Sequence, residues 1–156
     1  WNVHYLDVIE AYDIGHVHFF GNVLWFDGSM ATVPRQQVES FADHKWRDYE
    51  IVDFDWRTEC RKCAEAIKRN QPADWQTGVL VTHCVPHPVL NGHIKKSMSL
   101  FNAYSGVNWL LDEVQADYAI CGHTHYRIAG EVINGIRCVN VGNDYWPPFK
   151  HYLLEI

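Results

Sequence analysis

Three histidines carry the chemistry that this sequence suggests. His83 directly follows the apolar run 79–82, and His123 and His125 lie in Cys121-Gly-His-Thr-His125, directly after a second apolar run. Neutral imidazole is a common protein ligand for zinc, iron and nickel ions. Residues two apart in an extended chain share a face, so the two rings of His-Thr-His would point the same way. This pattern favours a metal site built from His83, His123 and His125.

The competing interpretation is that these histidines are ordinary. The chain contains ten of them, and a single His-x-His arises by chance, so alone it indicates a metal about one time in five. The metal-site interpretation is favoured by the position of these histidines directly after predicted strands. In an open sheet, functional groups gather beyond the carboxyl ends of the strands. Gly122 is expected to let the backbone turn tightly beside the ion.

The elements that must position these residues are predicted from hydrophobic pattern and turn signals. Buried strands are predicted at 78–82 and 118–121, and a hairpin at 128–141 around Asn134-Gly135. A second hairpin is predicted at 17–27 around Gly21-Asn22. Stacked sheets with helices outside are the expected arrangement.

Helices are predicted at 58–70, with Thr58 as the N-cap, and at 105–115, where apolar residues recur at helical spacing. Residues 29–48 are expected to be loop with a helical turn or two, 49–54 a short extended piece, and 151–156 a closing strand.

Composition places the chain among globular proteins. Its 156 residues suit one domain, and its 14% aromatic content can build a large core. The net charge of −6 argues against broad nonspecific binding to nucleic acid or acidic lipid. No apolar run approaches the roughly 20 residues that a membrane span needs, so no membrane contact is expected. Five irregularly spaced cysteines indicate reduced thiols and a cytoplasmic location.

Two short segments resemble motifs of a known family. Thr82-His83-Cys84-Val85-Pro86 is similar to the Thr-His-x-x-Pro motif of calcineurin-like metallophosphoesterases, and Gly122-His-Thr-His125 to their Gly-His-x-His motif. The resemblance extends over residues 15 to 156. It implies an α/β (α+β) fold, a four-layer α-β-β-α sandwich of which residues 1–156 form the C-terminal part of a single domain. The Asp-x-His, Gly-Asp-x-x-Asp and Gly-Asn-His motifs of the family are expected in a preceding, N-terminal part.

The resemblance also implies an activity, the metal-dependent hydrolysis of phosphomonoesters or phosphodiesters at a dinuclear centre with a bridging hydroxide. His83 and His123 would bind one metal and His125 the other, with manganese favoured over iron, zinc or nickel. The general-acid histidine is expected in the preceding part, so no catalytic residue is assigned here. Among the family's substrates, the acidic charge balance slightly favours a small nucleotide or a phosphoprotein over long DNA.

Two alternatives stay open. One is a noncatalytic binding or scaffold protein on the same fold with a degraded metal site, and the other is a mononuclear zinc hydrolase of another fold. Weaker candidates are Cys60-Arg-Lys-Cys63, read as buried helix positions rather than a metal or redox site, and His87 and His93, read as solvated loop residues rather than phosphate contacts.

Overall fold

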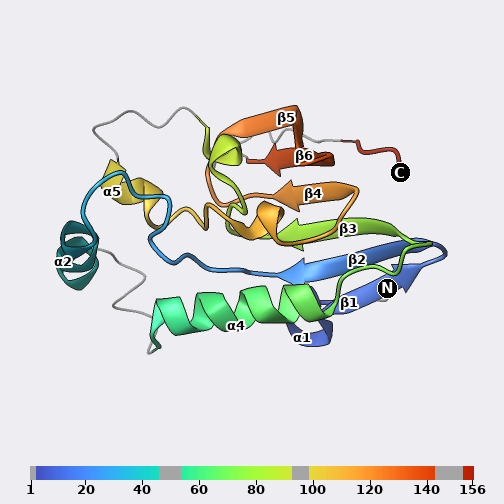
Figure 1. Ribbon diagram of the computed structural model, residues 1–156, viewed down its shortest axis with the longest axis horizontal. Helices are drawn as coiled ribbons and strands as arrows, with labels where there is room; N and C mark the ends of the chain where they lie inside the picture. Colours follow the sequence, from blue (N-terminus) through green and yellow to red (C-terminus); the bar gives the residue numbers. More distant parts are fainter. Residues whose placement is uncertain (1–2, 46–53, 93–98, 143–152) are drawn as a thin grey trace.

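The fold is built on one six-stranded mixed sheet (Figure 1). The computed structural model describes residues 3–45, 54–92, 99–142 and 153–156. The strand order is β1-β2-β3-β4-β6-β5. The strands are β1 (Ala11–Ile14), β2 (Val17–Asn22), β3 (Thr77–Thr82), β4 (Tyr118–Cys121), β5 (Arg127–Ile133) and β6 (Ile136–Val141). The helices are α1 (Leu6–Ile9), α2 (Arg35–Lys45), α4 (Trp56–Arg69), α5 (Ser99–Asn102) and the 3-10 turns η1 (Pro88–Asn91) and η3 (Leu110–Asp112).

The four central strands run parallel, and the two outer strands, β1 and β5, are antiparallel to their neighbours. The carboxyl ends of the parallel strands therefore meet at one edge of the sheet (Figure 1). The register aligns Asn22 with Thr82, and Cys121 with Asn140, at that edge. Loops that leave these four strands are brought together there, although they are far apart in the sequence.

The core lies on the face of the sheet that α4 covers. Phe20, Leu80, Ala119 and Cys138 form one row across four strands, and each is buried. The amphipathic helix α4 adds a stripe at helical spacing, which consists of Trp56, Cys60, Ala64 and Ile67. A sheet face and a helix stripe that are both apolar exclude water from each other, which stabilises their packing.

Helix α4 begins two residues earlier than its predicted start. Asp55 is the N-cap, its carboxylate accepting hydrogen bonds from the Arg57 amide at 3.1 Å and from the Thr58 hydroxyl at 2.7 Å. Thr58 was therefore wrongly predicted as the cap, because a carboxylate three residues upstream competes for the same role.

The hairpin predicted around Gly21-Asn22 is wrong. The turn of that hairpin lies at Gly15-His16, between β1 and β2, and β2 continues through Gly21. Gly21 has a φ of +143°, and a Cβ there would lie 1.9 Å from the carbonyl oxygen of Val81 on β3. This glycine permits a close approach of two backbones rather than a turn.

Two further predictions fail in the described residues. Segment 105–115 is a loop with the single 3-10 turn η3, not a helix, although its apolar residues Val107, Leu110, Leu111 and Val114 are all buried. Residues 153–156 are not in a strand. The eleven-residue helix α2 is longer than the turn or two expected there. The strands at 78–82 and 118–121 and the hairpin at 128–141 are confirmed, within a residue at their ends.

The fold is mixed α/β with few helices, and the expected four-layer α-β-β-α sandwich is not confirmed. Residues 3–45, 54–92, 99–142 and 153–156 contain one sheet, not two packed sheets. The extended piece expected at 49–54 lies almost wholly outside the described residues. Within the described part of the chain, no helix is both long and apolar enough to cross a membrane.

Candidate functional site

His83 lies one residue beyond the carboxyl end of β3, as predicted. The chain turns at this point because Thr82, which is buried, donates its hydroxyl hydrogen to the carbonyl oxygen of Cys84 at 2.7 Å. The Cys84 amide in turn donates to the carbonyl oxygen of Val23, beyond the end of β2, at 3.0 Å. These two bonds fix the backbone on both sides of His83, while its imidazole remains exposed.

His123 meets His83 across the edge of the sheet. Its Nδ1 lies 3.1 Å from Nε2 of His83, and the two rings are nearly perpendicular, with centroids 5.0 Å apart. The Gly122 amide donates to the carbonyl oxygen of His83 at 3.1 Å, so the two loops are also joined through their backbones. His123 has a φ of +61°, a left-handed conformation that is uncommon outside glycine and often found at functional sites.

The second nitrogen of His123 defines its tautomer. Nε2 lies 2.9 Å from the backbone carbonyl oxygen of Tyr104, and a carbonyl can only accept a hydrogen bond. Nε2 therefore carries the proton, and in the neutral ring Nδ1 keeps a lone pair directed at His83. A histidine that ligates a metal commonly donates its other ring N–H to a backbone carbonyl in this way.

The side chain of Asn140 anchors the His-Thr-His segment by a hydrogen bond. Its side chain is fully buried, and Nδ2 donates to Oγ1 of Thr124 at 2.7 Å and to the carbonyl oxygen of Leu90 at 2.8 Å. Its Oδ1 accepts from the Gly142 amide at 2.8 Å. One buried amide thus links the loop after β4, the turn η1 and the end of β6.

The glycine that the site requires is Gly142, not Gly122. A Cβ on Gly142 would lie 2.3 Å from the carbonyl oxygen of Thr124 and 2.6 Å from that of Tyr126. A Cβ on Gly122 would meet only the carbonyl oxygen of His83, at 3.9 Å, which is an ordinary contact. The tight turn expected at Gly122 is therefore not what brings the backbone close to the site.

His125 lies two residues further along the loop and is exposed. The structure joins His83 to His123, but His125 does not complete a three-ligand group with them. Within the described ranges, no three or more His, Cys, Asp and Glu side chains are arranged to hold a metal ion. The role of His125 at a second metal stays a prediction.

A cleft of about 480 Å³ opens beside His83. Its walls come from the carboxyl ends of β2 and β3, including Asn22 and Thr82, and from the N-terminal segment that contains His4 and Asp7. Asp7 is fixed there, because Oδ1 accepts from the Val23 amide at 2.6 Å. The sequence did not indicate His4 and Asp7 as site residues, because neither follows a predicted strand. The cleft that they line forms only when the chain folds.

The weaker candidates behave as ordinary structural residues. Burial raises the pKa of Cys63 to about 11 and raises that of Cys60 further, so both thiols stay protonated near neutrality, as expected for helix positions in the core. Burial lowers the pKa of His87, whose Nδ1 accepts a hydrogen bond from the Val89 amide and caps η1. His93 lies outside the described residues.

The fold is similar to that of phosphopantetheinyl hydrolase from Mycobacterium tuberculosis, with a TM-score of 0.62 and 17% sequence identity. The match covers 83% of this chain and 50% of that protein, so this chain spans about half the length of its structural neighbour. No family model matches the chain, and no curated protein matches it.

The assignment to calcineurin-like metallophosphoesterases is wrong by this comparison, because no model of any family matches the chain. Two motifs of four or five residues carried that assignment. Each fixes only three residues, and matches of that length arise by chance. The structural neighbour, at 17% identity, shows a shared fold and no more.

The His83–His123 pair fits a metal ion on geometric grounds. Two nitrogens that each lie about 2.0–2.1 Å from one ion, at angles between about 90° and 109°, are separated by about 2.9–3.4 Å. The observed separation of 3.1 Å falls in that interval, and it is also the length of a hydrogen bond between the two rings. Because Nε2 of His123 is bonded to Tyr104, Nδ1 is the ring nitrogen that faces His83, and a metal ion bound by the pair stays a prediction.

Proposed function

We propose that the chain forms part of a metal-dependent hydrolase that acts on phosphate esters. The observation that carries this proposal is the His83–His123 pair, in which Nδ1 and Nε2 are 3.1 Å apart and the opposite nitrogen of His123 is committed to the carbonyl oxygen of Tyr104. The fold that the chain shares with phosphopantetheinyl hydrolase is consistent with hydrolytic chemistry, though not with any particular substrate.

The role of the protein in this proposal is to position groups. A bound transition-metal ion would supply Lewis acidity toward a phosphoryl oxygen. His83 and His123 would hold it at the carboxyl edge of the sheet, and Asn140, buried beneath the loop, would keep the His123 ring in place. Imidazole ligands suit zinc, iron or nickel, and manganese stays a prediction. The further ligands would come from outside the described residues, since these contain no three-ligand group.

The cleft beside His83 is the proposed substrate site. Its volume of about 480 Å³ lies within the range of small-molecule sites. It opens directly beside the exposed imidazole of His83, so a phosphate ester in the cleft would lie next to the proposed metal.

The test is metal content, measured by elemental analysis on the intact natural protein, with hydrolysis of an aryl phosphodiester assayed on the same samples. We expect His123→Ala and His83→Ala each to lose bound metal and activity together. His16→Ala is the matched control, because His16 is exposed in the β1–β2 turn at the opposite end of β2, and it should change neither.

A protein that binds no transition metal, or a His123→Ala variant that keeps its full metal content, would sink the proposal. The chain would then be better described as a noncatalytic binding module. If the protein binds metal but hydrolyses neither a phosphomonoester nor a phosphodiester, the metal site is confirmed and the proposed hydrolase activity is rejected.

A further inference from the structure

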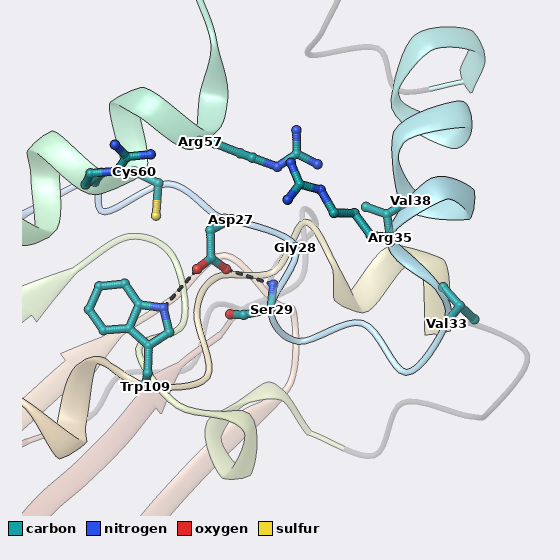
Figure 2. Close-up of a pocket in the computed structure, with 10 residues that line it drawn as sticks. Asp27, Gly28, Ser29, Val33, Arg35, Val38, Arg57, Cys60 and Trp109 are labelled. Atoms are coloured by element: carbon teal, nitrogen blue, oxygen red, sulfur yellow. Dashed lines mark hydrogen bonds between the residues drawn. The ribbon is translucent and has the colours of Figure 1, made fainter.

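A second pocket, of about 400 Å³, lies between the loop after β2, the start of α2 and the first turns of α4 (Figure 2). Three arginines from two different helices line it, namely Arg35, Arg57 and Arg61. Trp109 forms part of the opposite wall. We propose that this pocket binds the terminal phosphate of a small phosphorylated molecule, at a site separate from the histidine pair.

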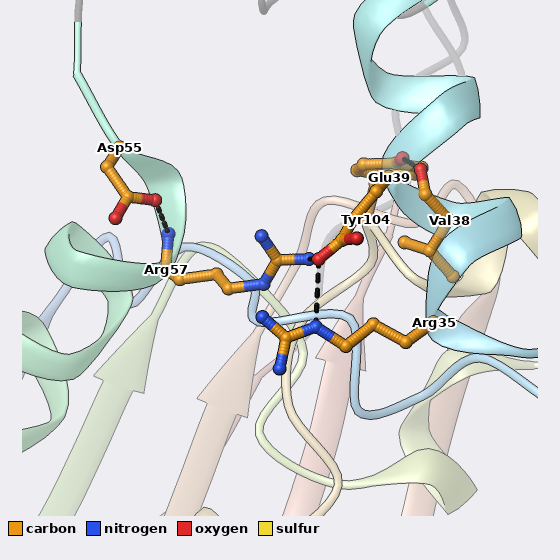
Figure 3. A network of polar contacts seen from close by, with 6 residues as sticks. All are labelled: Arg35, Val38, Glu39, Asp55, Arg57 and Tyr104. Carbon is orange, nitrogen blue, oxygen red and sulfur yellow. Dashed lines mark hydrogen bonds and ion pairs between the residues drawn. The ribbon is translucent and has the colours of Figure 1, made fainter.

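The arginines carry more positive charge than the pocket neutralises. Arg35 Nε and Arg57 Nη2 both donate to the same oxygen of Glu39, at 2.8 and 3.1 Å (Figure 3). A single carboxylate therefore balances two guanidinium groups. Arg61 makes no ion pair with any residue in the described ranges.

The other ionisable groups of the pocket leave this excess in place. The Asp27 carboxylate also lines the pocket, where it accepts from the Ser29 amide and from the Trp109 indole N–H, each at 2.8 Å (Figure 2). Burial, followed by the charge of Asp27, raises the pKa of Cys60, so that thiol stays neutral. Three cations and two carboxylates thus surround the pocket in a chain whose net charge is −6, and Asp55, at the start of α4, also interacts electrostatically with Arg57.

The arrangement suits phosphate better than carboxylate. A terminal phosphate offers three acceptor oxygens and a charge near −2, whereas a carboxylate offers two oxygens and a charge of −1. The planar forks of Arg bind phosphate through paired hydrogen bonds. The volume of about 400 Å³ exceeds that of inorganic phosphate, and Val33, Val38 and Trp109 supply apolar wall for an organic portion.

Tyr104 connects this pocket to the histidine pair. Its backbone carbonyl accepts from His123 Nε2, and its hydroxyl donates to the carbonyl oxygen of Val38, which lines the pocket. The two sites therefore contact opposite ends of one buried residue. The phosphate proposal rests on the arginines alone and does not depend on a metal at His83 and His123.

Isothermal titration of the intact natural protein with pyrophosphate tests the proposal. We expect Arg57→Gln and Arg61→Gln each to weaken binding about tenfold, as loss of a charged hydrogen bond implies. Arg69→Gln is the matched control, because it removes the same charge from the same helix at the other end, where Arg69 faces Glu10 at 3.6 Å. It should change the dissociation constant less than twofold.

Three outcomes would overturn the proposal. Pyrophosphate fails to bind at millimolar concentration, Arg69→Gln weakens binding as much as Arg57→Gln does, or binding survives both pocket variants and is lost in His123→Ala. Malonate serves as the dicarboxylate comparison, and binding equal to that of pyrophosphate would contradict the phosphate assignment. Thermal unfolding of each variant is measured beside the parent protein, so that a loss of binding caused by misfolding is recognised.

Discussion

The histidine pair and the arginine pocket lie at the same edge of the sheet but are held in different ways. The loop of His123 is fixed by the fully buried Asn140 and by the close backbone approach at Gly142. Two of the three arginines, Arg35 and Arg57, are held by ion pairs with Glu39, and the side chains of Arg35 and Glu39 are 75% and 43% exposed. The first arrangement is preorganised, and the second is solvated and weakened by salt.

The two arrangements suit different ligands, a metal ion in the first and a phosphate group in the second. A metal needs ligands fixed within a fraction of an ångström, so its supporting residues are buried and costly to alter. A phosphate group can be bound by long side chains that adjust to it, because the attraction between charges falls off slowly with distance.

The largest effect is expected for Asn140→Ala, with Asn108→Ala as its exposed counterpart. The first change removes a buried amide, so the carbonyl of Leu90 and the hydroxyl of Thr124 lose their hydrogen-bond donor. The free energy of unfolding should therefore fall by about 3 kcal/mol. Asn108 donates to Ser29 from an exposed position, and its loss should cost about 0.5 kcal/mol. Chemical denaturation measures both, and equal costs would contradict the comparison.

A smaller effect is expected for Gly142→Ala, with Gly122→Ala as the control. The new Cβ at position 142 must displace two backbone carbonyls, which should cost about 2 kcal/mol and disturb the His-Thr-His loop. At position 122 the nearest atom is 3.9 Å away, so alanine should be tolerated. The chemical shifts of the His123 ring would report the disturbance, and an unchanged ring in Gly142→Ala would show that the loop is less constrained than proposed.

The smallest effect is expected near the arginine pocket, for Asp55→Ala. Loss of the N-cap of α4 should lower the free energy of unfolding by about 1 kcal/mol, whereas Asp55→Asn, which can also cap, should be nearly neutral. The hydrogen bond from Thr58 lowers the pKa of Asp55 below its ordinary value of 3.8. Its contribution is therefore present above that value and lost as the pH falls through the lower folded pKa.

Denaturation at pH 7 and at successively lower pH separates these variants. The parent should lose the cap contribution in acid, and Asp55→Asn should not, because its amide does not titrate. If the parent and Asp55→Asn respond identically to acid, the cap does not depend on the charge of Asp55.

The sequence predicted the elements whose signals are local. The strands that end at Thr82 and Cys121 are short apolar runs, and Asn134-Gly135 is a strong hairpin signal, so these were correct. The turn predicted at Gly21-Asn22 was wrong because Gly21 instead allows the carbonyl of Val81, sixty residues away in the sequence, to approach closely. The helix predicted at 105–115 was wrong because this segment is a loop whose apolar residues pack into the core. Helical spacing of apolar residues does not distinguish such a loop from a helix.

The candidate site was predicted only in part. The strand-end positions of His83 and His123 brought them together as expected, because parallel strands end at one edge. Their support could not be read from the sequence, since Tyr104 and Asn140 act across 19 and 16 residues through a carbonyl and a buried amide. The family assignment failed because two short motifs carry too little information.

The irregularity in β5 bears on how the molecule avoids assembling with itself. Gly130 is an extra residue between Ala129 and Glu131, which pair with Val139 and Cys138 of β6, and its φ is +83°. This bulge interrupts the outer rim of the sheet, and the exposed Glu131 adds a charge there. A flat, uncharged rim would offer unpaired amides and carbonyls to a strand of a neighbouring molecule. We therefore expect the bulge and the charge to make the β5 edge less prone to pair with a strand of a neighbouring molecule.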